Sequence, residues 1–404
     1  MEKVNWYKLL DKAWKDFYKK KKAKGEDKKL YIEEFEENST KNLNLITKYL
    51  QTKKYNFGEW KAILIKKKDG GERPIIVPYP LRDKILLKTL CEYLTNIFSK
   101  DFNKVESVSF AYQKGKSSRD ALLQLKKMYK SGDVLLKIDI QHFFDEIDKE
   151  ILLQLLDNYK MDDYVKDLVG KSLRPAVDYS GIQNADLEKF PKGGIPQGNP
   201  ISNILSNLYL NDFDNLVIEK GWNMVRYADD MVFSLTSEDE ARFVLYEVEK
   251  YLSMERNLRI HPLGQKSDSK TAIFVNPKKN KMTYLGINFD GINLYLTDEC
   301  YSKLTSRIEE ILKNEDASID KEQLMLNAIK QWCGYYAFTD VKYNKLKNLN
   351  RAINYQIKKY RSSVSEVDVE KVMTETRKKQ NKRWYKIKEL IKPEDGNEWL
   401  DFYC

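Results

Sequence analysis

Two adjacent carboxylates set between two apolar runs constrain the fold of this chain more than any other feature. The stretch reads Met224-Val-Arg-Tyr-Ala-Asp-Asp-Met-Val-Phe233. Its flanks are rich in β-formers, so the pattern predicts a β-hairpin whose turn carries Asp229 and Asp230. Two neighbouring anions repel each other, which indicates a bound cation or a nearby Arg/Lys cluster. Aspartate is also a common turn residue, so a solvated hairpin tip is the alternative.

A third aspartate ends another apolar run. Residues 134–140 read Val-Leu-Leu-Lys-Ile-Asp-Ile, which predicts a buried strand with Asp139 at its far end. A carboxylate there is costly unless it is paired or ligated. Beside the predicted hairpin tip it would complete a set of oxygen atoms suited to Mg²⁺, which binds through one or two carboxylates plus substrate phosphates.

Three segments resemble motifs of bacterial reverse transcriptases, in the order that the family has them. Residues 227–230 (Tyr-Ala-Asp-Asp) resemble the YxDD box, residues 137–148 resemble the strand motif with the first catalytic aspartate, and residues 194–202 resemble the PQG motif. The resemblance runs from about Leu50 to Tyr360 and is to the group II intron and retron superfamily. It implies an α+β right-hand polymerase fold with fingers, a palm whose antiparallel sheet packs on helices, and a helical thumb.

The resemblance and the residue patterns together predict five segments. These are an N-terminal helical extension (1–50), fingers (51–134), a palm (135–292) with a fingers insertion at about 155–192, a helical thumb (293–363) and a basic helical tail (364–404). Residues 341–392 contain 16 Lys/Arg and 5 Asp/Glu, and 16 − 5 gives +11 against +10 for the whole chain. Such a concentration of charge indicates contact with a nucleic-acid backbone, although a solvated helix face would show the same excess.

The nucleotide-binding residues are expected near a second hairpin. Between Trp60 and Pro78, two strand-like runs joined by Asp-Gly-Gly predict a β-hairpin with cations beside its turn. The resemblance implies that Arg73 and Lys67 hold the triphosphate of the incoming nucleotide. It also implies that Phe144 packs under the sugar and excludes a 2′-hydroxyl, unless this ring belongs to the core. Gln197 of the PQG motif is expected to bind the nucleotide or the template.

Contacts with template and primer are implied at three further places. Tyr112 and Gly115 stand in a segment that resembles the family's template-contacting FxxGxS pattern, with Tyr112 in place of the phenylalanine. Lys270 begins a Lys-Thr pair like that of the family. Leu285 and Gly286 lie in Met282–Phe289, which resembles the primer-grip strand.

The function implied is RNA-directed DNA synthesis with two Mg²⁺ ions, for which Mn²⁺ is a possible substitute. Asp139, Asp229 and Asp230 are the expected catalytic residues, and these three with the backbone carbonyl of Ile140 are the expected metal ligands. Asp230 is expected to contribute less, because neighbours in an extended chain point to opposite faces. The expected partners are an RNA template, a DNA or RNA primer and deoxynucleotides. RNA synthesis, untemplated or protein-primed DNA synthesis, a maturase-like RNA-binding role and a carboxylate-dependent nuclease stay open.

Missing features narrow the class of reverse transcriptase. The retron NAxxH and VTG segments, the Ser-Gln of diversity-generating enzymes and an HNH-like Cys/His cluster are absent from the sequence. By elimination, this predicts a defence-associated, abortive-infection-like reverse transcriptase that works on a structured non-coding RNA. With two histidines and four widely spaced cysteines, histidine chemistry, a zinc ribbon and a disulfide framework are not indicated. No apolar run reaches a membrane span and no signal-peptide core is present, so a cytoplasmic protein without a membrane partner is expected, and self-association is left open.

Overall fold

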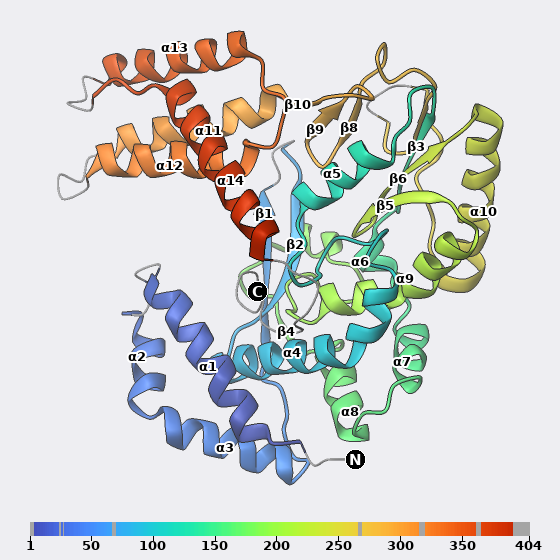
Figure 1. Ribbon diagram of the computed structural model, residues 1–404. Helices are drawn as coiled ribbons and strands as arrows, with labels where there is room; N and C mark the ends of the chain where they lie inside the picture. The colour runs from blue at the N-terminus through green and yellow to red at the C-terminus, as the bar shows by residue number, and fades with distance from the viewer. Residues whose placement is uncertain are drawn as a thin grey trace. The chain divides into compact units, whose positions relative to one another are not determined.

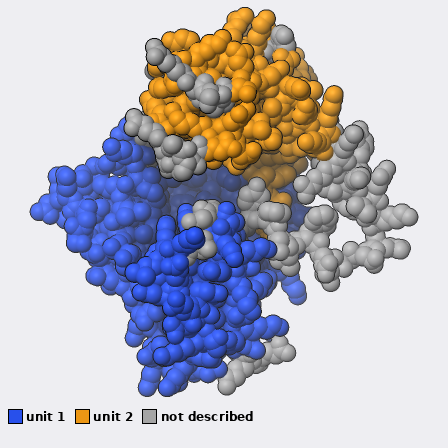
Figure 2. All heavy atoms as spheres, turned by 90° about the vertical axis from the view of Figure 1, so that its left-hand side faces the viewer, with its two compact units in different colours: residues 1–113, 138–231, 242–262 blue, residues 114–137, 232–241, 263–404 orange. Residues whose placement is uncertain are grey.

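The computed structural model of the chain describes residues 4–23, 26, 28–66, 70–265, 269–314, 320–360 and 365–390. Lys67, one of the predicted triphosphate-binding residues, lies outside them. The chain forms two compact units (Figure 2). Unit 1 holds Met1–Gln113, Ile138–Met231 and Arg242–Pro262, and unit 2 holds Lys114–Lys137, Val232–Ala241 and Leu263–Cys404.

The N-terminal part of unit 1 is helical, as predicted. It consists of α1 (Trp6–Ala23), α2 (Leu30–Glu37) and α3 (Ser39–Gln51). Helix α1 packs on α3 and on the long α4 (Leu81–Lys104). The ring of Trp14 lies 4.5 Å from that of Phe35, and its Nε1 donates a 2.8 Å hydrogen bond to Glu36. A tryptophan therefore anchors α1 on α2, with its polar atom satisfied.

The hairpin predicted between Trp60 and Pro78 is confirmed. Strands β1 (Trp60–Lys66) and β2 (Glu72–Pro78) pair antiparallel, with Ile65 opposite Arg73. The short β4 (Val177–Asp178) adds in parallel to β1, giving a three-stranded sheet in the order β2-β1-β4.

Helix α9 (Ser202–Glu219) contacts α4, α7 (Lys149–Asp157) and β5 (Asn223–Tyr227). Unit 1 also contains α6 (Phe143–Glu146), α8 (Asp163–Ser172) and the 3₁₀ helix η1 at Asn184–Lys189. Helix α9 is buried around most of its circumference, including the polar Asn207 and Asp214. A helix without a polar face belongs in a core, and its buried polar side chains need partners there.

A four-stranded sheet has the order β5-β6-β3-β7, with β6 at Asp230–Leu235, β3 at Val134–Asp139 and β7 at Ala272–Phe274. The predicted buried strand ending in Asp139 is therefore confirmed. Five of its six residues are buried, as expected for a continuous apolar run. Helix α10 (Glu238–Arg256) buries Ala241, Val244, Val248 and Leu252 at helical spacing.

In unit 2 the prediction of one strand over Met282–Phe289 is wrong. The segment forms a hairpin of β8 (Met282–Tyr284) and β9 (Ile287–Phe289), and β10 (Leu294–Leu296) completes a sheet in the order β10-β9-β8. Leu285 and Gly286 make the two-residue turn with φ values of 49° and 77°. Positive φ at both positions is the mark of a type I′ turn, which matches the twist of antiparallel strands. Leucine is apolar and uncommon in turns, so the sequence gives no local sign of this turn.

Four helices close unit 2 and lie together in Figure 1: α11 (Asp298–Lys313), α12 (Lys321–Tyr336), α13 (Tyr343–Lys359) and α14 (Val369–Leu390). Three of them lie within residues 293–363, where helices were predicted. One face of α13 is buried through Leu346, Leu349, Ile353 and Ile357, which recur at helical spacing. Earlier in the chain, α5 (Ser118–Met128) begins with a capping box formed by Ser117 and Asp120. The carboxylate of Asp120 accepts hydrogen bonds from the backbone N–H and the hydroxyl of Ser117. The five predicted domain boundaries stay a prediction.

Asp148 caps α7, as its place before Lys149 predicts. Its carboxylate accepts hydrogen bonds from the backbone N–H groups of Glu150 (2.9 Å) and Ile151 (3.2 Å). Partial burial opposes the charged form, but the bonds from Ile151, Asn257 and Glu150 outweigh it and lower the pKa of Asp148.

Replacing Asp148 by alanine is expected to destabilise unit 1 by about 1 kcal/mol at neutral pH, because α7 loses its cap. Since the folded pKa is lowered, this contribution is fully present above the unfolded pKa of about 3.9 and is lost as the pH falls through the folded value. Urea unfolding of both proteins at pH 7 and near pH 3 measures it. An equal difference at the two pH values would contradict the charged cap.

Candidate active site

The acidic turn is held by two neighbouring strands. Strands β5 and β6 are joined by Ala228 and Asp229 alone, and Asp230 is the first residue of β6. This confirms the predicted hairpin. Ala228 has a φ of 58°, a left-handed conformation that costs a residue with a Cβ of the order of 1 kcal/mol. Strain of this kind persists only where the surroundings enforce it, so the turn is positioned by the fold.

Asp139 lies beside this turn. In the sheet, β6 is the neighbour of β3, and the backbone N–H of Ile140 donates to the backbone oxygen of Asp229 at 3.4 Å. On the other side, the N–H of His261 donates to the backbone oxygen of Asp139 at 2.9 Å. The Asp139 side chain is only 7% exposed. Residues 139 and 229, ninety positions apart, thus come from adjoining strand ends.

These residues fit a site for a hard divalent cation. Carboxylates are the ligands that Mg²⁺ prefers, and the ion needs only one or two of them when substrate phosphates supply the rest. Within the part of the chain that the structure describes, no three His, Cys, Asp or Glu side chains cluster closely enough to enclose a metal by themselves. One or two carboxylates at the adjoining strand ends, with the phosphates of a bound substrate, would meet the coordination that such an ion prefers.

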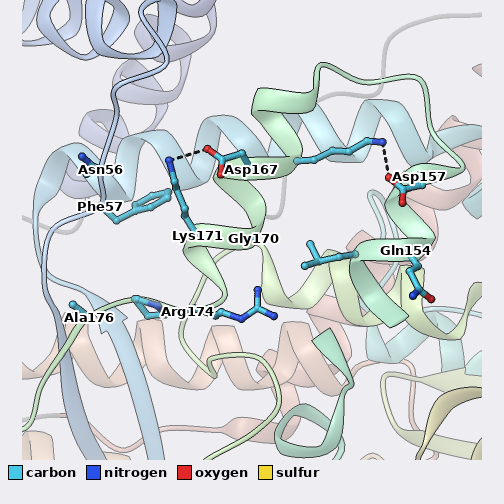
Figure 3. A pocket seen from close by; sticks show the side chains of 12 residues that line it. Asn56, Phe57, Gln154, Asp157, Asp167, Gly170, Lys171, Arg174 and Ala176 are labelled. Carbon is cyan, nitrogen blue, oxygen red and sulfur yellow. Dashed lines mark hydrogen bonds and ion pairs between the residues drawn. The ribbon is translucent and has the colours of Figure 1, made fainter. Parts of the chain in front are cut away.

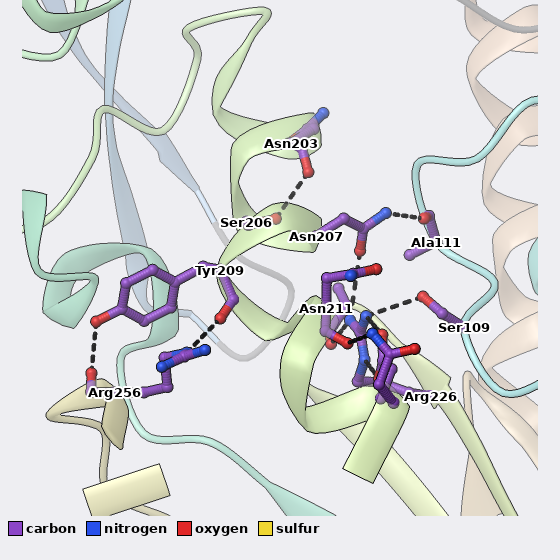
Figure 4. Close-up of polar contacts among 12 residues, drawn as sticks. Ser109, Ala111, Asn203, Ser206, Asn207, Tyr209, Asn211, Arg226 and Arg256 are labelled. Carbon is purple, nitrogen blue, oxygen red and sulfur yellow. Dashed lines mark hydrogen bonds and ion pairs between the residues drawn. The ribbon is translucent and has the colours of Figure 1, made fainter. Parts of the chain in front are cut away.

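A buried arginine fixes the backbone just before the turn (Figure 4). Arg226 forms an ion pair with Asp214 of α9 in which both side chains are 1% exposed. Its Nη1 donates a hydrogen bond of 2.8 Å to the carbonyl of Ala228, and its Nη2 donates one of 2.9 Å to the hydroxyl of Ser109. Asn207 of α9 accepts from Nη1 at 3.3 Å. Arg226 therefore ties the strained residue of the acidic turn to the core helix.

Tyr112 interacts electrostatically with the acidic turn and with Arg73, which is predicted to bind the triphosphate. Burial raises the pKa of Tyr112 to about 12, and the negative charge of Asp229 acts in the same direction, while Arg73 opposes it. Arg73, exposed on β2, also acts on Asp145, whose carboxyl has its pKa raised by burial. Gln197 Nε2 donates to Asp145 Oδ1 at 3.0 Å. Tyr112, predicted as a template contact, is therefore influenced by the charges of both Asp229 and Arg73.

The two phenylalanines after Asp139 differ in exposure. Phe143 is 3% exposed and belongs to the core, whereas Phe144 is only partly buried, with its ring 5.5 Å from that of Phe143 in an edge-on arrangement. Partial exposure leaves Phe144 available to a ligand. Its role as the residue under the sugar stays a prediction.

The other expected template and primer residues belong to unit 2. Gly115 has a φ of 75° and open space where a Cβ would stand, and Lys270 is exposed. The carbonyl of Gly286 accepts hydrogen bonds from Thr297 Oγ1 (3.2 Å) and Cys300 Sγ (3.4 Å). The turn of the β8–β9 hairpin is therefore fixed to the start of α11.

Two side-chain contacts of the candidate site were not predicted from the sequence. Arg226 stands inside an apolar run, and an arginine in a buried strand signals an ion pair, but the sequence does not show that Asp214 is the partner. The contact between Asp145 and Gln197 joins residues 52 positions apart, and nothing in their local pattern indicates it.

A family model described as "Reverse transcriptase (RNA-dependent DNA polymerase)" matches residues 65–289, more than half of the chain. The chain belongs to the reverse transcriptase family. This range includes Arg73, Asp139, Gln197 and the acidic turn. Family membership confirms the predicted α+β right-hand polymerase fold.

Curated proteins that are similar to this reverse transcriptase match it over only part of their own length. The "Putative COX1/OXI3 intron 1 protein" of Saccharomyces cerevisiae is 32% identical over 174 residues, 43% of this chain and 20% of that protein. The "Retron Ec83 reverse transcriptase" of Escherichia coli is 27% identical over 180 residues, 45% of this chain and 54% of that protein. The chain thus matches about a fifth and about half of these relatives. A solved structure of apo telomerase from Candida tropicalis is similar at 16% identity over 88% of this chain and 73% of that chain, with a TM-score of 0.48, which adds nothing to the family assignment.

A cavity of about 690 Å³ in unit 1 is lined by α7, α8 and the segments that precede β1 and β4 (Figure 3). Its lysines are paired, Lys166 with Asp157 and Lys171 with Asp167, both at 2.8 Å, and Arg174 pairs with Glu150. None of the predicted site residues lines it. Each of the three cations that line the cavity thus has a carboxylate partner. In the described residues, no helix combines the length and apolar character needed to span a bilayer.

Proposed function

We propose that the chain is an RNA-directed DNA polymerase that joins deoxynucleotides by two-metal-ion nucleotidyl transfer. The observation that carries the proposal is the contact between Ile140 and Asp229, which joins the strand ends that carry Asp139 and the acidic turn within the region matched to the family. One or two carboxylates from adjoining strand ends, together with substrate phosphates, are what a divalent ion of this kind requires.

In this reaction the primer's 3′-oxygen attacks the α-phosphorus of the nucleotide, and the bond to the pyrophosphate oxygen breaks. Asp139, Asp229, the carbonyl of Ile140 and, to a smaller extent, Asp230 would hold two Mg²⁺ ions, with Mn²⁺ as a substitute. When bound, the ions lower the pKa of the primer hydroxyl and stabilise the charge on the leaving group. Asp230 is proposed to contribute less to metal binding, because it is the first residue of β6 and one of its carboxylate oxygens is buried.

Arg73 would bind the triphosphate. It is exposed on β2 and its charge reaches both Tyr112 beside Asp229 and Asp145 beside Gln197. Phosphoryl transfer depends mainly on positioning and on electrostatic stabilisation, both of which a guanidinium supplies to phosphate oxygens. Lys67, on the same hairpin in sequence, is proposed for the same role.

Template and primer would be bound by Tyr112, Gly115, Lys270 and the Leu285–Gly286 turn. Gly286 is exposed in this left-handed turn and has open space where a Cβ would stand. A nucleic-acid backbone can approach such a surface closely. We propose that the primer is a DNA or an RNA strand.

Primer extension tests the function. The purified chain is given an RNA template and an annealed primer with separate pools of dNTPs and rNTPs. Template-dependent extension with dNTPs and Mg²⁺ is expected. Extension only with rNTPs, or dNTP addition that ignores the template sequence, would replace the proposal by one of the other polymerase activities, and RNA binding without any synthesis would favour a maturase-like role.

Replacing Phe144 by alanine is expected to relax the selection against ribonucleotides. A partly exposed ring beside the sugar would clash with a 2′-hydroxyl, and removing a steric contact of this size changes specificity about 10- to 200-fold. The ratio of kcat/KM for one rNTP to that for its dNTP measures the effect. Phe143→Leu is the matched control, because Phe143 is buried and should affect stability but leave this ratio unchanged.

The template is proposed to be a structured non-coding RNA, and the biological role anti-phage defence. The basic composition of residues 341–392 supports binding to an extended RNA. Sequencing the RNA that co-purifies with the protein, together with any cDNA, tests the first statement. Phage plating on cells with the unaltered chain and with an Asp139→Asn variant tests the second. Random cellular RNA, or equal plating, would contradict the respective statement.

A further inference from the structure

One outward stripe of α10 carries two large apolar side chains with two opposite charges between them. Phe243 and Met254 are 55% and 69% exposed. Glu247 and Lys250 lie between them on the same side of the helix, because the four residues follow the spacing i, i+4, i+7, i+11. Tyr246, which is 60% exposed, flanks this α10 stripe. Single exposed apolar residues are common, but aromatic residues and methionine gathered on one face are typical of protein interfaces.

The opposite side of α10 holds the helix firmly on α9. Arg256 donates a hydrogen bond of 2.7 Å from Nε to the carbonyl of Tyr209 and forms an ion pair of 2.7 Å with Asp212 (Figure 4 shows the first contact). The ring of Tyr251 lies 5.5 Å from that of Phe213. A helix that is already fixed loses little conformational freedom on binding, so the α10 stripe is prepared for association.

The order of side chains in the α10 stripe is complementary to itself. From Phe243 onwards the stripe is apolar, acidic, basic and apolar. If the same stripe of a second copy runs antiparallel to it, Phe243 lies opposite the partner's Met254, and Glu247 lies opposite the partner's Lys250. Each contact then occurs twice, because the pairing has a twofold axis. In a parallel pairing each charge would meet its own counterpart and be repelled, so the charges select the antiparallel arrangement.

The charges also decide between kinds of partner. Glu247 and Lys250 cancel, so the α10 stripe has no net charge. RNA or an anionic membrane surface would be attracted by an excess of cations, which the stripe lacks. A second copy, by contrast, supplies an apolar side chain for each apolar one and the opposite charge for each charge.

We propose that α10 is the contact surface of a homodimer, in which the stripe Phe243–Glu247–Lys250–Met254 packs antiparallel against the same stripe of a second copy of the chain. The stripe extends about 16 Å along the helix, which makes the contact small beside the ~1,600 Å² of a standard protein interface. Association is therefore expected to be weak and to depend on concentration. The inference does not depend on the proposed polymerase function, because none of the four residues belongs to the proposed active site.

Sedimentation equilibrium of the full chain over a range of concentrations tests the charge pairing. Glu247→Lys and Lys250→Glu should each raise Kd by about tenfold, because both symmetric contacts change from attraction to repulsion. An equimolar mixture of the two variants should associate as tightly as the unaltered chain, since every contact in the mixed dimer again joins opposite charges. Glu249→Lys is the matched control. It makes the same charge change about 200° around the helix from Glu247 and should leave Kd within about twofold of its original value.

A second variant tests the apolar contacts. Phe243→Ser should raise Kd by about thirtyfold or more, because a buried aromatic ring is lost at both ends of the interface. Circular dichroism shows that each variant is folded. An unaltered chain that is monomeric at about 100 μM, or single charge variants that dimerise as tightly as the unaltered chain, would overturn the inference. So would two weakened variants whose mixture does not associate. Failure of primer extension by a dimeric unaltered chain would contradict the proposed function and leave the α10 dimer standing.

Discussion

Replacing Asp139 or Asp229 by asparagine is expected to lower the rate of primer extension by on the order of 10³-fold or more. A bound metal ion stabilises the charge of the transition state by several kcal/mol, and about 4 kcal/mol corresponds to about 10³-fold in rate. The two residues come from adjoining strand ends, so each change removes one of the charged ligands that we propose for the metal ions. Single-nucleotide addition at saturating dNTP, with Mg²⁺ and with Mn²⁺, measures kcat directly. Asp230→Asn should cost less than Asp229→Asn.

The matched control is Asp167→Asn, which also removes one carboxylate from unit 1. Asp167 pairs with Lys171 on α8, and both side chains are well exposed, so activity should stay within a factor of two or so of the unaltered chain. Far-ultraviolet circular dichroism and the thermal midpoint of each variant show whether it is folded. Undiminished DNA synthesis in a folded Asp139→Asn, Asp229→Asn double variant would remove the basis of the proposed mechanism.

Features encoded by neighbouring residues were predictable from the sequence. The β1–β2 hairpin, the strand ending in Asp139 and the Asp148 cap each depend on residues within a few positions of one another. The buried face of α13 follows in the same way from apolar spacing along one helix. The motif residues themselves were found by resemblance to the family, and the family match is consistent with it.

What the sequence did not show depends on distant contacts or on enforced strain. Leu285 adopts a left-handed conformation because the hairpin is fixed at Gly286 by Thr297 and Cys300, and leucine gives no sign of a turn. Asp145 meets Gln197 across 52 residues, and Arg226 meets Asp214 through a strand and a helix whose packing only the fold defines. In each case a residue acquires its role from partners that tertiary structure brings to it.

The buried ion pair leads to the largest expected effect on stability. Arg226→Ala should destabilise the protein by about 3–5 kcal/mol, because Asp214 would keep a buried charge without its counter-ion. Replacing the pair by apolar residues, Arg226→Met with Asp214→Leu, should cost less, since no charge is then left in the core. Urea unfolding followed by circular dichroism gives the free energy of unfolding for each variant. Activity of the apolar double variant should still fall, because the carbonyl of Ala228 loses the donor that fixes the acidic turn.

Arg174→Ala is the control for removing an arginine from unit 1. Its partner Glu150 and Arg174 itself are 69% and 47% exposed, so the loss should be less than about 1 kcal/mol. The Arg226→Met, Asp214→Leu double variant separates the two roles expected of Arg226. Stability is expected to depend on the charge balance with Asp214, and catalysis on the bond to Ala228. Should Arg226→Ala unfold at the same urea concentration as Arg174→Ala, the buried pair would not hold the core. Should the folded apolar variant retain full kcat, the left-handed turn would keep its position without the arginine, and the link from α9 to the acidic residues would be structural only.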